Sequence, residues 1–484
     1  MEIDVTGVPI EAVDADTFAL AIPDPADPLP AEVEGLWTLV ASGEAPTQRG
    51  SARLVHVDGR RVLGAGVGPR AEVDADAIRD AAAGAARELQ ASVGGSVAWI
   101  LDPALLAPEE QARAVIEGAV LGGYDPGAWK TQNDRPLIER LTLVSEVDVG
   151  ETARQAGVVA EWTNHARDLA NRPANDLTPV ELAEHAAGIA ARFDTLTSSG
   201  LGPEEMLVRG MGAILAVGQG SQNEPRMILM RYEPTWPTQP DLVLGLVGKG
   251  MTFDTGGISL KKRDYMEDMK GDMAGGGAVI AAMGAIAELG LPVRAIAVVG
   301  AAENMPGGSS YRPGDILTAM NGKTIEVTDT DAEGRIVLAD TLAYAREEGA
   351  THLLDLATLT GAMERALGDF YAGVFGNDAA WRDQVVAAGE ASGDHAWPWP
   401  MHPRYGRFIE SAFADMKNHN IRAQGIPVYA AEFLREFAGE GPWAHIDMAG
   451  TGFLTWSRGD YLSQKGGTGY GVRLIAELAA RLSA

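Results

Sequence analysis

The spacing of apolar residues in the first 150 positions predicts a small domain of strands and helices. Short strand-like stretches lie at 51–57 (SARLVHV), 96–101 (SVAWIL) and 138–144 (IERLTLV). Ala-rich stretches of helical period lie among them, at 74–90 and 108–123. Because strands and helices alternate along the chain, we assign residues 1–150 to an N-terminal α/β domain.

A helical pattern at 151–171 follows this domain and leads into RPANDLTP (172–179). The prolines, asparagine and aspartate of that stretch stop a helix. We interpret residues 151–175 as a connecting helix and linker, and residues 176–484 as a second domain.

Continuous apolar runs in the second domain predict buried parallel strands, at 241–248 (DLVLGLVG), 293–301 (VRAIAVVGA) and 351–359 (THLLDLATL). Helical patterns at 274–290 and 334–349 separate them. This order is typical of a doubly wound domain with a mostly parallel sheet. The predicted fold class is therefore α/β, with a small N-terminal and a larger C-terminal domain.

Composition excludes several classes of protein. With 46% hydrophobic residues the chain is globular, and no run of about 18 uncharged apolar residues predicts a membrane span. The net charge of −28 disfavours nucleic acid and anionic membranes as partners. The chain has no cysteine, which excludes disulfides and thiolate metal sites. The acidic N-terminus lacks the features of a signal peptide, so we expect a cytoplasmic protein.

Polar residues gather where the predicted parallel strands end, which is where such sheets bind ligands. The segment after the first strand carries Lys249, Asp254, Lys261 and Asp272. A later segment, TDTDAEGRIVLAD (328–340), has three acidic residues directly before a predicted helix. It contributes Asp331, Glu333 and Arg335. We therefore expect acidic side chains from separate loops to converge on one cleft.

Other interpretations of these stretches are weaker. Asp331 and Glu333 could simply cap a helix and complement its dipole. Neither GKGMTFDTGG (248–257) nor NGKT (321–324) matches a phosphate-binding loop, because the required glycine spacing is missing. Asp-Thr-Gly at 254–256 occurs in aspartic proteases, but no second equivalent loop or all-β pattern accompanies it. The eight histidines form no close ligand pair for zinc.

Several short motifs occur together along the second domain. They are VGKGMTFDTGG, NMPGG, YRPGDI, DTDAEGRIVLAD and LATLTGA, with RPANDLTP, ADMKN and TGYGVR beside them. Read together, these motifs resemble the leucyl aminopeptidase family, the dinuclear metallopeptidases of the cytosol aminopeptidase type. The resemblance runs from about residue 165 to 473, and the N-terminal domain is similar only in character. One departure is Asp329, where the family usually has Asn.

The resemblance implies a site for two divalent metal ions. By the family's pattern the ligands are Lys249, Asp254, Asp272, Asp331 and Glu333. Asp254 and Glu333 would bridge the metals, Asp331 would bind one of them, and Lys249 with Asp272 the other. Four carboxylates balance two dications, and Lys249 would bind as a neutral amine because nearby dications depress its pKa. Oxygen-rich ligation does not distinguish Mn²⁺, Zn²⁺ and Mg²⁺.

The same resemblance implies a mechanism. A water bridging two dications would act as hydroxide near neutral pH and attack the first peptide bond. Asp272 and one metal would hold the free α-amine of the substrate, and Lys261 would polarise the scissile carbonyl. Arg335, at a helix N-terminus, would bind bicarbonate as the general base.

The sequence therefore predicts a metal-dependent aminopeptidase that releases leucine and other neutral residues from peptides with a free N-terminus. The resemblance also implies a homohexamer. Two alternatives stay open. One is a binding or regulatory protein with the same fold and no catalysis; the other is a related peptidase restricted to Cys-Gly or other dipeptides.

Overall fold

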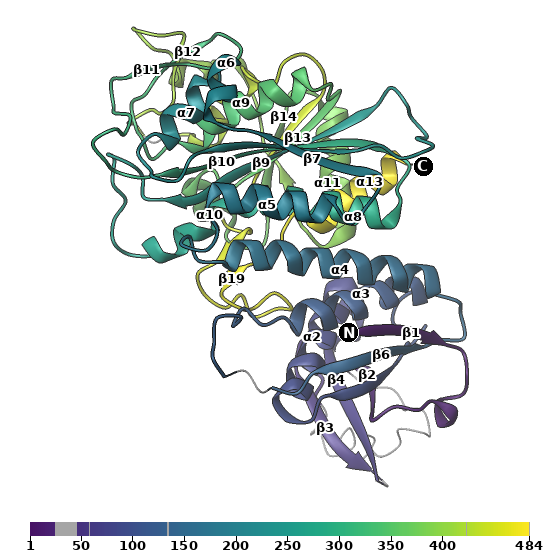
Figure 1. Cartoon of the computed structure of the whole chain (residues 1–484). Helices are drawn as coiled ribbons and strands as arrows, with labels where there is room; N and C mark the ends of the chain where they lie inside the picture. The colour runs from purple at the N-terminus through teal and green to yellow at the C-terminus, as the bar shows by residue number, and fades with distance from the viewer. Residues whose placement is uncertain (25–45, 58, 133–134, 423, 484) are drawn as a thin grey trace. The chain divides into compact units, whose positions relative to one another are not determined.

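The computed structural model describes residues 1–24, 46–57, 59–132, 135–422 and 424–483. They form two compact units, Met1–Asn164 with Trp456–Gln464 and His165–Thr455 with Lys465–Ala484 (Figure 1). Each unit is built around its own β-sheet with helices packed on it. The predicted α/β fold class, with a smaller N-terminal and a larger C-terminal domain, is confirmed.

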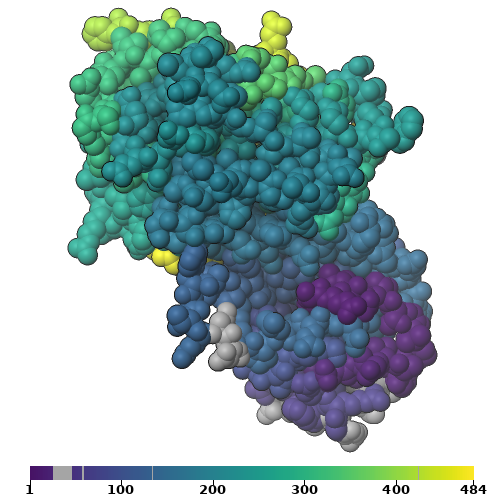
Figure 2. Space-filling model, in the orientation of Figure 1, coloured from purple at the N-terminus to yellow at the C-terminus, as the bar shows by residue number. Residues whose placement is uncertain are grey.

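The first unit contains a six-stranded sheet in the order β1-β6-β5-β2-β4-β3. All neighbours are parallel except β3 and β4. The strands are β1 (Glu2–Thr6), β2 (Thr17–Asp24), β3 (Ala52–Val57), β4 (Arg60–Pro69), β5 (Gly95–Ile100) and β6 (Ile138–Val144). Strands β3, β5 and β6 confirm the three strands predicted here. The edge strand β1 belongs to the purple surface in Figure 2.

Helices α2 (Ala75–Ser92) and α3 (Pro108–Gly122) confirm both helices predicted for this unit. Asp74 caps α2, because its carboxylate accepts the backbone N–H of Ala77 at 2.8 Å. Arg79 on α2 and Glu117 on α3 form a buried ion pair at 2.6 Å. This pair links the two helices.

The predicted helix at 151–171 is α4 (Gly150–Asn171), which contributes residues to both units. It ends directly before RPANDLTP, as predicted, and the last residue of that stretch starts α5 (Pro179–Ala190). The Thr178 hydroxyl accepts the N–H of Glu181, and the Glu181 carboxylate accepts the N–H of Thr178. This reciprocal capping satisfies two backbone donors that the helix leaves free.

The second unit contains an eight-stranded sheet in the order β15-β14-β17-β13-β9-β10-β8-β7. The four central strands, β17, β13, β9 and β10, are parallel to one another, while β14, β8 and β7 each pair antiparallel with a neighbour. The strands are β7 (Leu196–Leu201), β8 (Arg226–Tyr232), β9 (Val243–Asp254), β10 (Arg294–Asn304), β13 (His352–Ala357), β14 (Ala372–Gly376), β15 (Ala396–Pro398) and β17 (Trp443–Asp447). Strands β9, β10 and β13 confirm the predicted parallel core.

Helices cover both faces of this sheet. Figure 1 shows α5 and α8 (Ala274–Leu289) on one face and α7 (Gly212–Gly218) and α9 (Gly334–Glu347) on the other. Helix α8 approaches the strands closely, since a Cβ added to Gly275 would lie 2.2 Å from the carbonyl oxygen of Leu356. The glycines of AGGG (274–277) therefore let the first turn of α8 pack directly against the ends of the strands. Asp272 lies just before this turn.

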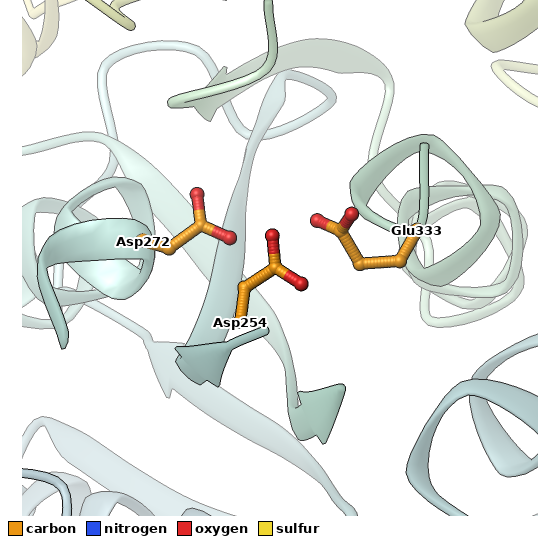
Figure 3. Close-up of side chains that lie close together, drawn as sticks. All are labelled: Asp254, Asp272 and Glu333. Atoms are coloured by element: carbon orange, nitrogen blue, oxygen red, sulfur yellow. The ribbon is translucent and has the colours of Figure 1, made fainter. Parts of the chain in front are cut away.

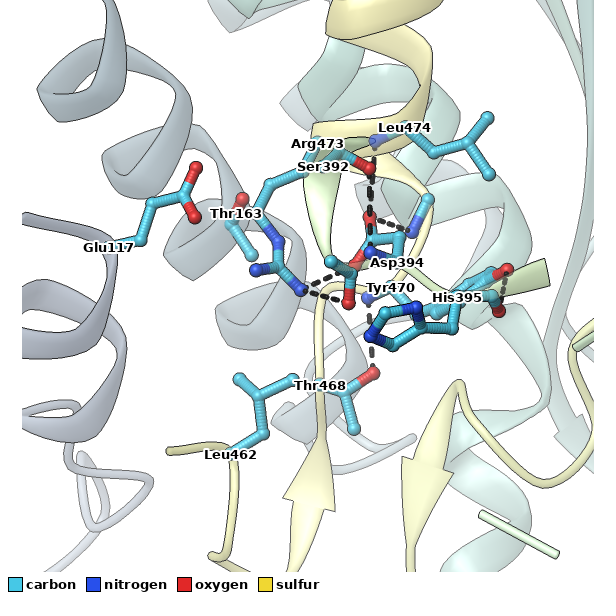
Figure 4. A network of polar contacts seen from close by, with 12 residues as sticks. Glu117, Thr163, Ser392, Asp394, His395, Leu462, Thr468, Tyr470, Arg473 and Leu474 are labelled. Atoms are coloured by element: carbon cyan, nitrogen blue, oxygen red, sulfur yellow. Dashed lines mark hydrogen bonds and ion pairs between the residues drawn. The ribbon is translucent and has the colours of Figure 1, made fainter. Parts of the chain in front are cut away.

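A buried carboxylate holds the last helix, α13 (Val472–Leu482). Asp394 accepts hydrogen bonds from the N–H groups of Gly471 and Leu474 and pairs with Arg473 at 2.6 Å (Figure 4). Three contacts from one end of the helix compensate the burial of the charge.

One helical segment, Met266–Leu289, is long and apolar enough to cross a membrane by length and composition, with a mean hydropathy of 1.3. Within the protein 89% of that window is buried. This is the burial expected of a core helix, and α8 forms most of the segment.

Candidate active site

The seven residues singled out in the sequence line one cavity of about 240 Å³. It lies at the carboxyl ends of the central parallel strands, as predicted from the fold class. Strand β9 and the loop after it supply the first three residues, and the 3₁₀ segment Met266–Met273 supplies the fourth. The fifth and sixth lie in the turn before α9, and the seventh lies in the first turn of that helix. In chain order they are Lys249, Asp254, Lys261, Asp272, Asp331, Glu333 and Arg335.

Three buried carboxylates point toward one another in this cavity (Figure 3). Asp254, Asp272 and Glu333 each offer an oxygen, and these oxygens lie within 4.8 Å of one another. Oxygen Oδ2 of Asp272 is buried and has no hydrogen-bond partner among the described residues. Carboxylates this close repel one another, and the free oxygen of Asp272 can still accept a ligand bond. Divalent cations bind such oxygen donors, so these residues are suited to the predicted metal ions.

Two lysines pair with the four predicted carboxylate ligands. Lys249 Nζ lies 2.8 Å from both Asp272 Oδ1 and Glu333 Oε1. Lys261 Nζ lies 2.7 Å from Asp254 Oδ2 and also pairs with Asp331. Each predicted ligand is thus in direct contact with a partner of opposite charge.

The charge of this cluster is not balanced by the lysines alone. Burial disfavours their charged form, but the carboxylates outweigh it and raise the pKa of both Lys249 and Lys261. Burial also raises the pKa of Asp272 to about 8 and that of Asp331 to about 7. Without metal, the lysines and these bound protons offset the carboxylate charge; two bound dications would take over that role, with Lys249 as a neutral amine.

Arg335 is buried in the first turn of α9. Its Nη1 donates to the carbonyl oxygen of Asn418 at 2.8 Å, and its guanidinium lies 5.5 Å from the ring centre of Tyr429. Its Nε has no hydrogen-bond partner in the part of the chain that the structure describes. Burial lowers the pKa of Arg335, so an anion beside it would stabilise its charge.

Asp329 does not line the cavity. Its Oδ1 accepts the backbone N–H of Asp331 at 2.9 Å, and its carbonyl oxygen accepts the side-chain amide of Asn418. The residue therefore shapes the turn that presents Asp331.

Sequence reasoning missed two residues that orient the predicted ligands. Asn304, the last residue of β10, donates its side-chain amide to Asp254 Oδ1 at 2.8 Å. The Thr358 hydroxyl donates to Asp272 Oδ1 at 2.7 Å, and its carbonyl accepts from Lys249. Supporting contacts of this kind fix ligand orientation. Thr358 lies in the motif LATLTGA and Asn304 in NMPGG. The motifs therefore pointed to these residues, but their contacts with the ligands are visible only in the fold.

Comparison with known proteins identifies the family. A model of the cytosol aminopeptidase family catalytic domain matches residues 164–476, and one of that family's N-terminal domain matches residues 24–133. The chain belongs to the cytosol aminopeptidase family. The predicted resemblance is confirmed, and membership identifies the protein as a metal-dependent aminopeptidase, a hydrolase.

Members of the cytosol aminopeptidase family match almost the whole chain. This chain is 49% identical to a probable cytosol aminopeptidase of Roseiflexus castenholzii over 428 residues, which cover 86% of each chain. A probable cytosol aminopeptidase of Solibacter usitatus is 44% identical over 99% of each chain. Among solved structures, the bottromycin maturation enzyme BotP in complex with Mn has a TM-score of 0.87 and 34% identity, over 97% of this chain and 100% of that one.

Proposed function

We propose that the protein releases leucine and other neutral residues from the N-terminus of peptides, using two divalent cations. The observation that carries this proposal is the cluster of three buried carboxylates within 4.8 Å, in a cavity that two lysines also line. The ligands would be Lys249, Asp254, Asp272, Asp331 and Glu333. Bound there, two cations would supply a shared water acidic enough to act as hydroxide near neutral pH. The donor set suits Mn²⁺, Zn²⁺ or Mg²⁺.

The remaining groups have separate tasks in this proposal. Lys261, whose side chain is partly exposed in the cavity, directs its charge at the oxyanion that forms on the substrate carbonyl. Asp272 orients the free α-amine, which restricts cleavage to the first peptide bond. Arg335 and the backbone N–H groups at the start of α9 would hold bicarbonate, which would supply a general base for the proton of the attacking water.

Leucine p-nitroanilide should be hydrolysed by the purified protein supplied with Mn²⁺, because its amine is free and its side chain neutral. N-acetyl-leucine p-nitroanilide should resist, since acetylation removes the basic amine that Asp272 and one metal would hold. Release rates for Cys-Gly and for longer leucine peptides distinguish this function from that of a dipeptidase. If no substrate with a free N-terminus is cleaved, the proposal is wrong.

Family membership further supports a homohexamer in the cytoplasm, and we propose both. Light scattering at micromolar concentration should give six times the chain mass of 50.9 kDa. A mass equal to that of one chain would contradict the hexamer.

A further inference from the structure

Five acidic residues line the active-site cavity, and one of them differs from the other four. Asp254, Asp272, Asp331 and Glu333 each pair with Lys249 or Lys261. The fifth, Glu364, has no ion pair and no side-chain hydrogen bond within the residues described. It is the one acid of this lining without a lysine partner.

Helix α10 (Gly361–Leu367) carries Glu364, which is exposed. Gly361 and Glu364 are three positions apart, so they lie on the same face of the helix, and both line the cavity. The helix is anchored at its start, where the hydroxyl of Thr360 donates to the buried carboxylate of Asp447 at 2.6 Å. A carboxylate on such an anchored element is suited to selecting a ligand.

The surroundings of Glu364 suit an alkyl chain that ends in a cation. Met269, Leu359 and Ala449 line the same cavity and provide apolar contacts. Partial burial raises the pKa of Glu364, and the neighbouring Arg365 offsets only part of that effect. A bound cation would therefore favour the charged form of Glu364. The net charge of −28 also raises the local concentration of cationic peptides.

We propose that Glu364 is a specificity residue that favours N-terminal lysine or arginine over a neutral residue of the same shape. The alkyl stem would lie against Met269 and Leu359, and the ammonium or guanidinium group would meet the Glu364 carboxylate. This inference rests on the proposed aminopeptidase function and extends its substrate class beyond neutral residues.

Lysine p-nitroanilide and norleucine p-nitroanilide differ only at the end of the side chain, so their kcat/KM ratio measures recognition of the ammonium group. The metal-loaded enzyme should prefer lysine by up to about fivefold, the effect expected of an ion pair at an exposed carboxylate. Glu364→Gln should remove most of that preference. Calorimetric binding of free lysine and norleucine should show the same change without turnover.

The matched control is Glu440→Gln, an equal change of charge at an exposed residue preceding the amino end of β17, away from the cavity. It should keep the lysine preference. Equal kcat/KM for the two substrates in the unmodified enzyme would overturn the inference. So would an equal loss on both in Glu364→Gln, which would mean that Glu364 binds the α-amine. Failure to cleave even leucine p-nitroanilide would instead refute the aminopeptidase function.

Discussion

Prolonged dialysis against a chelator should abolish the aminopeptidase activity and lower the melting temperature. Metal that binds only the folded protein stabilises it, by about 2.7 kcal/mol when its concentration is a hundred times Kd. Its removal also restores the repulsion among the carboxylates of Asp254, Asp272 and Glu333. Adding Mn²⁺ or Zn²⁺ should recover both properties. Elemental analysis should find two divalent ions in each active subunit.

Substitution of single ligands tests which residues hold the metal. Asp331→Asn and Glu333→Gln should each weaken metal binding, because each removes one of four charges that offset two dications. The loss at Glu333 should be larger, since this residue is buried and predicted to bridge both ions. Asp241→Asn is the matched control, at an exposed position two residues before the start of β9, and this variant should retain its metal. Full activity in exhaustively chelated, metal-free protein would rule out the metal site.

Most of the central fold could be predicted because its signals are local. The parallel strands β9, β10 and β13 are continuous apolar runs, and the helices between them have a clear period. The strand-end rule then located the cavity without knowledge of the sheet order. The antiparallel pairing of β7, β8 and β14 could not be predicted, because strand pairing depends on contacts distant in sequence.

The roles of residues that depend on tertiary contacts could not be predicted from the sequence either. Asp340 ends the motif DTDAEGRIVLAD in mid-helix, where an acid is usually solvated, yet it is fully buried. Its carboxylate accepts the backbone N–H groups of Ala213, Ile214 and Met320. Glu364 likewise resembles any helical surface acid until the fold places it in the cavity. No local pattern distinguishes such residues from exposed ones.

Lys261→Ala should lower kcat by about 10²–10³, the usual cost of removing a group that stabilises an oxyanion. In the proposed mechanism Lys261 is not a metal ligand, so the variant should keep its metal content. Lys262→Ala is the matched control, because the adjacent Lys262 is exposed and does not line the cavity. A near-normal kcat in Lys261→Ala would show that another group stabilises the oxyanion.

Arg335→Ala should lose about 10²–10⁴ in kcat, the typical contribution of a general base, because the bicarbonate that accepts the proton loses its site. The unmodified enzyme, freed of carbonate, should be activated by added bicarbonate, whereas the variant should respond little. Arg335 also donates to Asn418 and contacts Tyr429, so a melting curve must show that the variant folds. Arg335→Lys keeps the charge and should recover part of the response. Bicarbonate activation of normal size in Arg335→Ala would place the anion, and with it the base, elsewhere in the cavity.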